Sequence, residues 1–500
     1  METSLNAARR ARDLDDARRE VADLLVVGLG ATGAGVALDA AARGLSVVAI
    51  DAHDLAFGTS RWSSKLIHGG LRYLASGQIG LARESAAERH VLIRHTAPHL
   101  VKAQPYLLPL TPGVPAATAR KLMTGYRLGD LLRAAAGTPR KLIPGPARLG
   151  AAEALDLVPA LAADGLRGAL RSYDGRVVDD ARLVVALART AAGHGARVLT
   201  RCRALGLAGD GAEVRDELTG DVFTVRARAV VNATGVWAGL LAPEITLRPS
   251  RGTHLVLREG VLGPLRAGLH VPIPGESSRF LLVLPQSDGH VLVGLTDEPV
   301  EGPVHDVAEA PEGDVEFLLA TLNGVLGVPV TRDQVAGAHA GLRPLLDTGS
   351  GQGTADLSRR HAVLRGADGV VTVVGGKLTT YRRMAEDAVD AACPQARRST
   401  TARLPLVGAA TRGIRAPWRL VERYGAEAED ITALIESNRA LGAKVLPGEP
   451  TTWAELLWAV RHEGALDEDD LLDRRTRIGL IPEDRQMALK VARHVLSLQP

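Results

Sequence analysis

The chain has 500 residues, so two or three domains are expected, and its 46% hydrophobic content excludes a largely disordered protein. Sixty Lys and Arg residues against 57 Asp and Glu residues leave a formal charge of only +3, which argues against a nucleic-acid-binding protein. The two cysteines, Cys202 and Cys393, are too few for a disulfide scaffold or a cysteine-rich metal site, so we expect a reduced, intracellular protein with no metal.

Residues 1–22 interleave arginines with acids and lead into no apolar signal segment, so they are predicted to form a solvated helical or frayed extension. No apolar run in the sequence approaches the ~20 residues that span a bilayer. Any contact with a membrane is therefore expected to be peripheral, with the protein lying on the membrane surface.

Residues 23–51 are predicted to form a strand, a glycine turn, a helix and a second strand that ends at Asp51. The turn is Gly28-Leu29-Gly30-Ala31-Thr32-Gly33. Its first glycine permits the tight turn, the second lets the backbone approach a pyrophosphate at the helix N-terminus, and the third lets helix and strand pack closely. The Asp51 carboxylate can accept hydrogen bonds from ribose hydroxyls. The segment therefore predicts a dinucleotide site.

Two later segments repeat the pattern of a buried strand that runs into glycine. Residues 224–233 are predicted as one apolar strand entering Ala233-Thr234-Gly235, which resembles the second fingerprint of FAD-dependent oxidoreductases. Residues 370–374 lead into Gly375-Gly376-Lys377 and then into a helix from about Thr380. These glycines and the lysine can face a flavin ring, so the expected dinucleotide is FAD.

The predicted fold is α/β plus α+β, with a doubly wound, Rossmann-like FAD domain, an interleaved antiparallel-sheet substrate domain and a C-terminal all-helical domain. The FAD domain is expected in three pieces, at residues 23–97, 151–245 and 345–395. The substrate domain is expected at residues 98–150, as helices and loops, and at residues 246–344, with a hairpin around Ser287-Asp288-Gly289. The helical domain is expected at residues 400–500.

A run of hydroxyls, glycines and cations follows Asp51 by about a dozen residues and suits the binding of phosphates and a flavin: Ser63-Ser64-Lys65-Leu66-Ile67-His68-Gly69-Gly70-Leu71-Arg72-Tyr73-Leu74. With two later runs, it resembles the FAD-dependent, quinone-linked glycerol-3-phosphate dehydrogenases; these runs are Gly341-Leu342-Arg343-Pro344-Leu345 and Gly375-Gly376-Lys377-Leu378-Thr379-Thr380-Tyr381-Arg382. Shorter matches share that family's order and spacing: Arg251-Gly252-Thr253-His254, Gly294-Leu295-Thr296-Asp297, Trp458-Ala459-Val460-Arg461-His462-Glu463 and Asp473-Arg474-Arg475-Thr476-Arg477. The resemblance covers about residues 22–495.

The resemblance implies oxidation of sn-glycerol 3-phosphate to dihydroxyacetone phosphate, with hydride transfer from C2 to FAD. The residues expected to carry the chemistry are His254 as the base, with His68 as the alternative, and Arg343, Lys377 and Arg72 as cations. Those expected to bind substrate are Arg72, Tyr73, His254, Arg343, Lys377 and Thr380. Those expected to bind FAD are Gly28, Gly30, Ala31, Thr32, Gly33, Asp51, Thr59, Ser60, Ser63, Ser64, Lys65, His68, Gly69, Gly70, Ala233, Thr234, Gly235, Gly376, Lys377, Leu378 and Thr379.

Three positions depart from the family pattern. Leu29 stands where the family usually has a glycine, and Asp51 stands where Glu is commoner. Arg61-Trp62 interrupts a stretch that is usually made of small residues, which bears on the contacts expected near Thr59 and Ser60.

The resemblance also implies a quinone electron acceptor and peripheral, monotopic attachment to the inner face of the cytoplasmic membrane, and a homodimer is a further expectation. Three alternatives stay open at this point. They are an oxidase that passes electrons to oxygen, an amine or hydroxy-acid oxidoreductase of the same fold, and a flavin-binding protein without turnover.

Overall fold

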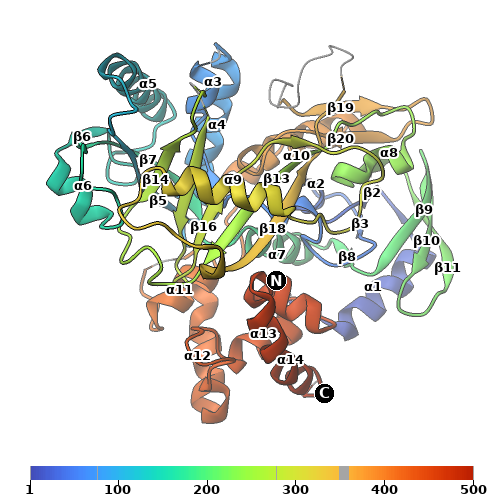
Figure 1. The fold of residues 1–500 in the computed structure, drawn as a ribbon. Coiled ribbons are helices and arrows are strands. Elements are labelled where there is room, and N and C mark those ends of the chain that lie inside the picture. The colour runs from blue at the N-terminus through green and yellow to red at the C-terminus, as the bar shows by residue number, and fades with distance from the viewer. Residues whose placement is uncertain (1, 76, 277–278, 348–359, 411, 499–500) are drawn as a thin grey trace.

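The structure is a computed structural model that describes residues 2–75, 77–276, 279–347, 360–410 and 412–498 (Figure 1). A six-stranded sheet forms one half of the molecule, with neighbouring strands in the order β19 (Ala362–Arg365), β20 (Val371–Val374), β12 (Val230–Asn232), β2 (Leu24–Val27), β3 (Val47–Ile50) and β8 (Arg197–Leu199). Every neighbouring pair is parallel except β19 and β20. The expected parallel, Rossmann-like sheet is thereby confirmed.

All four residues of β2 are apolar and buried. Since successive residues of a strand point to opposite faces, both faces of the sheet are covered. On one face lie α2 (Ala31–Ala42), α7 (Asp180–Gly193) and α10 (Tyr381–Ala392), whose side chains share a core with Leu24 and Val26. On the other face, Leu25 and Val27 pack against a four-stranded sheet of β1 (Val21–Ala22), β11 (Val222–Ala227), β10 (Gly211–Asp216) and β9 (Cys202–Ala208).

The single strand predicted at residues 224–233 is wrong. The structure divides this segment between β11 in the four-stranded sheet and β12 in the six-stranded sheet. The break falls at Arg228, whose side chain is 77% exposed and pairs with Asp23 at 2.8 Å. A solvated arginine cannot continue a strand that is buried on both faces, so the chain turns there.

A second, ten-stranded sheet forms the other half of the molecule. Its strands are β17 (Glu298–Pro299), β13 (Ser250–Leu257), β16 (Val291–Gly294), β15 (Phe280–Pro285), β14 (Gly268–Pro272), β5 (Val101–Pro109), β7 (Ala169–Val177) and β4 (Leu66–Ile67), with β18 (Val335–Arg343) paired to β13 and β6 (Ala147–Leu149) paired to β7. The expected hairpin is present, because β15 and β16 pair antiparallel around residues 286–290. The sheet also takes in β5, from a stretch expected to hold helices and loops, and β7, from a stretch expected in the FAD domain.

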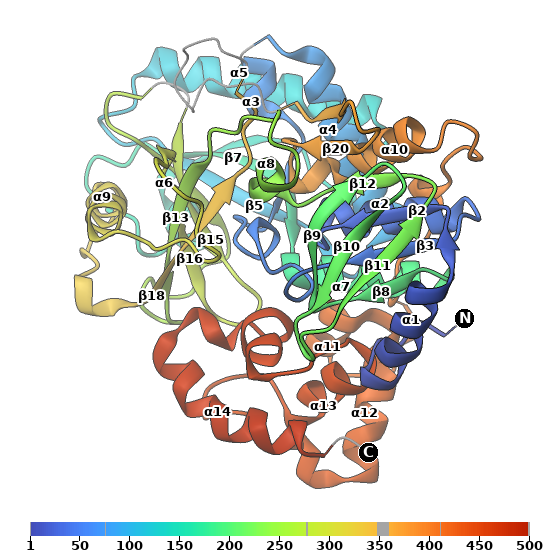
Figure 2. The same ribbon diagram turned by 90° about the vertical axis from the view of Figure 1, so that its right-hand side faces the viewer.

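Helices cover the two ends of the molecule (Figures 1 and 2). The C-terminal helices, in red, pack on one another below both sheets; they are α11 (Trp418–Tyr424), α12 (Ala428–Ser437), α13 (Trp453–His462) and α14 (Pro482–Leu496). The opposite end carries α3 (Leu71–Ala75), α4 (Ile79–Val91) and α5 (Ala116–Ala135). The remaining helices are α6 (Ala151–Leu157), α8 (Ala238–Leu241) and α9 (Glu312–Asn323). Within the described ranges, no helix combines the length and apolarity that crossing a bilayer requires.

The N-terminal extension forms a helix, α1 (Ala7–Arg19), that packs on the protein. Asn6 caps it by accepting a hydrogen bond from the Arg9 amide at 2.9 Å, and Leu14 is buried. Just before the helix, the Leu5 amide donates to the carbonyl of His462 at the end of α13. The extension therefore joins the FAD half to the C-terminal helices and is not frayed.

Candidate active site

The predicted glycine turn lies between β2 and α2, and its glycines have steric reasons to lack a side chain. Gly28 has a φ of +101°, and a Cβ there would stand 2.6 Å from the carbonyl oxygen of Ala233. A Cβ on Gly33 would stand 1.7 Å from the carbonyl oxygen of Gly28, so the helix could not approach the strand. At the start of α2, the Ala31 amide donates to the Ser60 hydroxyl at 2.8 Å.

Asp51 follows β3 and turns its carboxylate back onto the turn. One oxygen accepts from the Leu29 amide at 2.6 Å, and the other accepts from the His53 amide at 2.8 Å. Burial raises the pKa of Asp51 to about 6, although these two amides and the nearby Arg201 act in the opposite direction. The carboxylate is thus held in a fixed orientation beside the turn.

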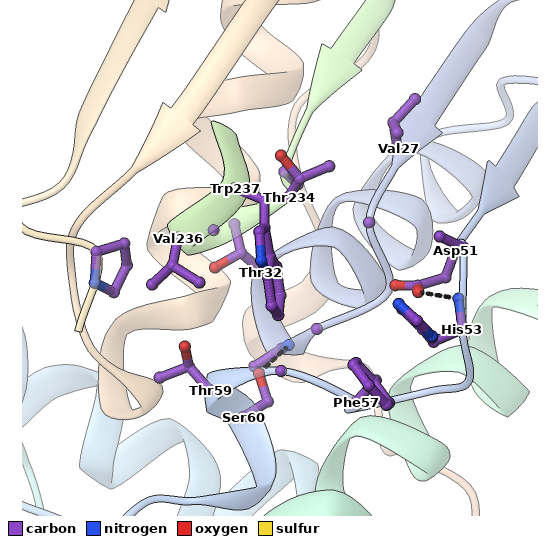
Figure 3. Close-up of a pocket in the computed structure, with 18 of the residues that line it drawn as sticks. Val27, Thr32, Asp51, His53, Phe57, Thr59, Ser60, Thr234, Val236 and Trp237 are labelled. Carbon is purple, nitrogen blue, oxygen red and sulfur yellow. Dashed lines mark hydrogen bonds between the residues drawn. The ribbon is translucent and has the colours of Figure 1, made fainter. Parts of the chain in front are cut away.

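A cavity of about 390 Å³ opens between the turn, β12 and the segment that follows β20. Figure 3 shows Trp237 extending into its centre, with Asp51, His53 and Phe57 on one side and Val236 on the other. Many residues predicted to bind the cofactor line this one cavity: Gly28, Gly30, Ala31, Thr32, Asp51, Thr59, Ser60, Ser63, Ala233, Thr234, Gly235, Gly376, Lys377 and Leu378.

Other residues predicted to bind the cofactor do not line the cavity; these are Gly33, Ser64, Lys65, His68, Gly69, Gly70 and Thr379. Lys65 is fully buried, and its ammonium donates to Asp180 and to the carbonyl of Arg61, both at 2.8 Å. A Cβ on Gly69 would stand 2.3 Å from the Arg89 guanidinium, and one on Gly70 would stand 2.7 Å from Cα of Ala82. The lysine and these two glycines therefore serve packing in this structure.

Several residues expected near the substrate gather where β4 and α3 meet the segment after β20. The Lys377 ammonium lies 4.1 Å from the centre of the Tyr73 ring, which is buried. The His68 ring lies edge-on to Tyr73 at 6.0 Å, and the His68 amide donates to the Thr379 hydroxyl at 3.2 Å. Thr380 is buried in the turn that begins α10, and its hydroxyl donates to the Lys377 carbonyl at 3.3 Å. Since Lys377 lines the cavity, this group reaches it.

His254 lies on β13, between β16 and β18. Its Nε2 shares a hydrogen bond of 2.9 Å with the Ser64 hydroxyl. Burial, with a smaller contribution from the nearby charges of Lys65 and Arg343, lowers the pKa of His254 to about 3. The imidazole is therefore neutral at neutral pH, which is the form that accepts a proton.

Arg343 ends β18 and is held on several sides. Its guanidinium donates to Asp297 at 3.1 Å, to the Ser250 hydroxyl at 2.9 Å and to the Thr296 carbonyl at 3.0 Å. The side chain keeps 21% of its surface exposed, so it is fixed in place without being enclosed. Arg72 belongs to α3 by its backbone, but its side chain lies outside the described residues.

Comparison with known proteins identifies the family. Residues 23–382 match the family described as FAD dependent oxidoreductase, and residues 399–499 match the C-terminal domain of alpha-glycerophosphate oxidase. Glycerol-3-phosphate dehydrogenase 1 of Mycobacterium tuberculosis is 49% identical over 509 residues, which cover 99% of this chain and 98% of that protein. The chain belongs to the FAD-dependent glycerol-3-phosphate dehydrogenase family.

Solved structures agree with this assignment. The glycerol-3-phosphate dehydrogenase from Bacillus halodurans, complexed with FAD, is 25% identical, has a TM-score of 0.75, and is matched over 99% of this chain and 94% of that one. The L-alpha-glycerophosphate oxidase from Mycoplasma pneumoniae is 17% identical with a TM-score of 0.60, over 77% of this chain and 99% of that one, and shares the fold alone.

The cofactor of this dehydrogenase is FAD, and the cavity residues fit it. The turn leaves room for a pyrophosphate at the start of α2, and the Asp51 carboxylate offers acceptors for ribose hydroxyls. The Trp237 side chain lines the cavity, and its buried indole nitrogen has no hydrogen-bond partner among the described residues. When bound, FAD supplies a two-electron acceptor.

Some cavity residues of the dehydrogenase were not predicted from the sequence; among them are His53, Phe57, Val236, Trp237, Tyr381 and Met384. His53 and Phe57 stack at 3.8 Å and follow Asp51 closely, but aromatic residues in a loop after a strand carry no specific signal. Trp237 directly follows the Ala233-Thr234-Gly235 fingerprint, and this adjacency is the signal that could have identified it.

Proposed function

We propose that this dehydrogenase oxidises sn-glycerol 3-phosphate to dihydroxyacetone phosphate, with the C2 hydride passing to FAD and the electrons then passing to a quinone. The observation that carries the proposal is that Lys377 lines the cavity, while His254 and Arg343, which do not line it, are each linked through a chain neighbour to a residue that does. Lys377 lines the cavity directly, and the cavity residues Ser63 and Pro344 are chain neighbours of Ser64 and Arg343. The names of the relatives support the choice of substrate.

His254 is the proposed base. The hydroxyl proton on C2 goes to the imidazole as the C2 hydride leaves, so that the alcohol becomes a ketone and the base holds one proton. The step requires a base that is unprotonated at neutral pH, and the His254 imidazole is neutral there. His68, beside Tyr73, is the alternative base.

Arg343 and Lys377 are the proposed phosphate ligands, joined by Arg72. Arg343 is already fixed by Asp297 and by two backbone carbonyls, those of Arg251 and Thr296, so binding a phosphate on its exposed edge orders no further side chain. Lys377 adds a point charge next to the Tyr73 ring. Thr380, in the turn after Lys377, is proposed to help position the substrate.

The test is anaerobic mixing of the purified, FAD-loaded protein with sn-glycerol 3-phosphate while the flavin absorbance is followed. We expect the oxidised flavin band to bleach and one equivalent of dihydroxyacetone phosphate to form. A flavin that stays oxidised with this substrate, but bleaches with an amino acid or another hydroxy acid, would refute the substrate assignment.

The proposed quinone acceptor and the contact with the inner face of the cytoplasmic membrane are supported by the surface of α5. Three apolar side chains are strongly exposed on α5 and the adjoining start of α4: Leu131 at 65%, Ile79 at 61% and Leu128 at 46%. Arg120, Lys121 and Arg127 are exposed along the same helix. Exposed apolar and basic side chains on one helix suit an anionic lipid surface.

The buried side of α5 connects this surface to the site. Leu132 of α5 packs in one cluster with Tyr73, and Tyr73 contacts Lys377 at the cavity. A membrane-held quinone beneath α5 would therefore lie on the other side of this cluster from Lys377.

Vesicle sedimentation and reoxidation assays test the two proposals. The protein is expected to sediment with vesicles that contain phosphatidylglycerol, and the double variant Leu128→Ser/Leu131→Ser is expected to lose this binding. Val328→Ser, which changes an apolar residue that is 80% exposed elsewhere, is the matched control. The reduced enzyme is expected to reduce a soluble quinone analogue faster than oxygen, and stoichiometric peroxide formation would instead indicate an oxidase.

A further inference from the structure

The two residues that break the family pattern, Arg61 and Trp62, lie at one end of a column of stacked side chains that reaches His254. The Arg61 guanidinium lies 4.1 Å from the centre of the Trp62 ring. Trp62 stacks on His339 at 5.1 Å, and His339 stacks on His254 at 5.2 Å with only 14° between the ring planes. The last contact follows from strand register, because His254 and His339 are directly opposite each other on β13 and β18.

The other face of the His254 ring is closed by backbone. Gly294 of β16 is the register partner of His254, and a Cβ there would lie 2.3 Å from the imidazole Cδ2. The ring is therefore clamped between a glycine on one side and the His339 ring on the other. It cannot turn about its χ2 axis unless one of these neighbours moves.

This clamp replaces the usual means of orienting a histidine. A functional imidazole is normally fixed by a hydrogen bond on the nitrogen opposite the working one. The His254 Nδ1 atom is buried and has no hydrogen-bond partner among the described residues, whereas Nε2 bonds the Ser64 hydroxyl. Stacking, and not a second hydrogen bond, is what holds the ring.

At the end farthest from His254, the column reaches the cavity through Arg61. The Arg61 Nε donates to the carbonyl of Phe57 at 2.9 Å, and Phe57 lines the cavity. Trp62 packs closely against Gly341, since a Cβ added to Gly341 would lie 2.6 Å from the Cβ of Trp62. The column therefore runs from the cavity wall to the proposed base.

We propose that Trp62 and His339 are positioning residues, which hold the His254 imidazole by stacking so that Nε2 stays on the hydroxyl of Ser64, the chain neighbour of the cavity residue Ser63. This inference rests on the proposed role of His254 as the base. It assigns a purpose to the Arg61-Trp62 departure, which the family resemblance leaves without one.

Charged and titratable groups face His254 from several elements. They are Lys65 from the loop before β4, Arg343 and His339 from β18, and Arg61 at the far end of the column, while β16 contributes only Gly294. None of these groups is a carboxylate. Water admitted by removing the His339 ring would therefore raise the pKa of His254 from about 3 toward its ordinary value.

The first experiment measures flavin reduction by anaerobic stopped flow in His339→Ala, His339→Phe, Trp62→Ala and Trp62→Phe. Both alanine variants are expected to reduce FAD roughly 10- to 100-fold more slowly at saturating substrate, because a misplaced base slows proton transfer. Their FAD content and the substrate concentration for half-maximal rate should stay near those of the parent. The phenylalanine variants keep a flat ring and should stay within about threefold of the parent, since stacking survives. Trp453→Ala removes another tryptophan that contacts a histidine, His494 at 5.5 Å, and is the matched control.

The second experiment follows the His254 imidazole by nitrogen NMR of histidine-labelled protein across a pH range, without substrate and without turnover. The parent should show one neutral tautomer down to the lowest pH at which it stays folded, whereas His254 in His339→Ala should titrate at higher pH.

An unchanged reduction rate in His339→Ala, or an equal loss in His339→Phe, would overturn the positioning role. Should the parent fail to oxidise glycerol 3-phosphate, the proposed function falls, and the NMR titration alone decides whether the column holds His254. If the alanine variants do not fold, Trp62→Phe/His339→Phe decides the question, because a large loss in that double variant contradicts a role that depends only on stacking.

Discussion

Asp51 shows how one short side chain can serve both the turn and the cofactor. It accepts hydrogen bonds from Leu29 and His53 inside the cavity, and burial raises its pKa to about 6. A carboxyl whose pKa is raised in the folded state favours its protonated form there, so ionisation of the empty site costs stability as the pH rises from about 4 to about 6. A ribose hydroxyl that donates to the carboxylate acts in the opposite sense and favours ionisation.

The affinity of the cofactor-free protein for FAD should therefore increase as the pH rises through about 6. Asp51→Asn should bind FAD about 10- to 100-fold more weakly, because a hydrogen bond to a charged acceptor is lost, and should lose this pH dependence. Quenching of FAD fluorescence across pH 5 to 8, measured on both proteins, checks the prediction. A pH dependence that persists in Asp51→Asn would assign it to another group, with His53 as the neighbour to change next.

Lys65 is a residue whose role differs between sequence and structure. Family resemblance places it at the cofactor, whereas its ammonium is buried against Asp180. Lys65→Met should lower the free energy of unfolding by about 3–5 kcal/mol, because it leaves the buried Asp180 carboxylate without its cation. The double variant Lys65→Met/Asp180→Asn should recover most of that loss, and Lys121→Met on the exposed face of α5 should change little. Denaturant unfolding of the three variants checks this, and equal losses in the single and double variants would contradict it.

At the scale of elements, α1 is tied down by one buried ion pair. Arg10 donates to Asp216 at 2.7 Å and to the Thr200 carbonyl at 2.9 Å, and only 1% of the Asp216 side chain is exposed. Arg10→Ala should therefore destabilise the protein by about 3 kcal/mol, since the remaining carboxylate stays buried without its cation. Arg12→Ala, in the exposed part of the same helix, should stay within about 0.5 kcal/mol of the parent. Thermal unfolding measures both, and equal midpoints would mean that the helix contributes no stability through Arg10.

The elements that the sequence predicts well are those whose signal is local. The glycine turn, β2, β3 and the β15–β16 hairpin each carry their pattern within one short stretch of chain, and all are found. The strand predicted at residues 224–233 fails because the same apolar pattern serves two sheets, and only tertiary packing decides where Arg228 divides them. The partners of Lys65, Arg10 and Arg343 lie far away in the chain, so no local pattern could supply them.

At the scale of the whole molecule, the C-terminal helices are joined to the FAD half through buried charges. Asp54, which is fully buried after β3, accepts hydrogen bonds from both Arg474 and Arg475 at 2.7 Å. These arginines hold the pKa of Asp54 well below its ordinary range, although burial alone would raise it. Glu463 pairs with Arg182 in the same interface, and both side chains are buried. Separating the C-terminal helices from the FAD half would leave charges without partners in each of these two parts.

The protein should consequently unfold as one cooperative unit although it is built from three parts. Three of its five tryptophans, Trp418, Trp453 and Trp458, lie in the C-terminal helices. Trp62→Phe/Trp237→Phe confines the tryptophan signal to those helices, while visible circular dichroism of the bound flavin reports on the FAD half.

The two signals should share one midpoint in urea, and Asp54→Asn should shift both midpoints together to lower urea by the equivalent of about 3 kcal/mol. Two separate midpoints in the parent would mean that the helices unfold independently, and the buried ion pairs would then not couple the parts. A shift confined to the helix signal in Asp54→Asn would lead to the same conclusion. A shared shift would show that the interface charges, and not only the continuity of the chain, make one folding unit of the protein.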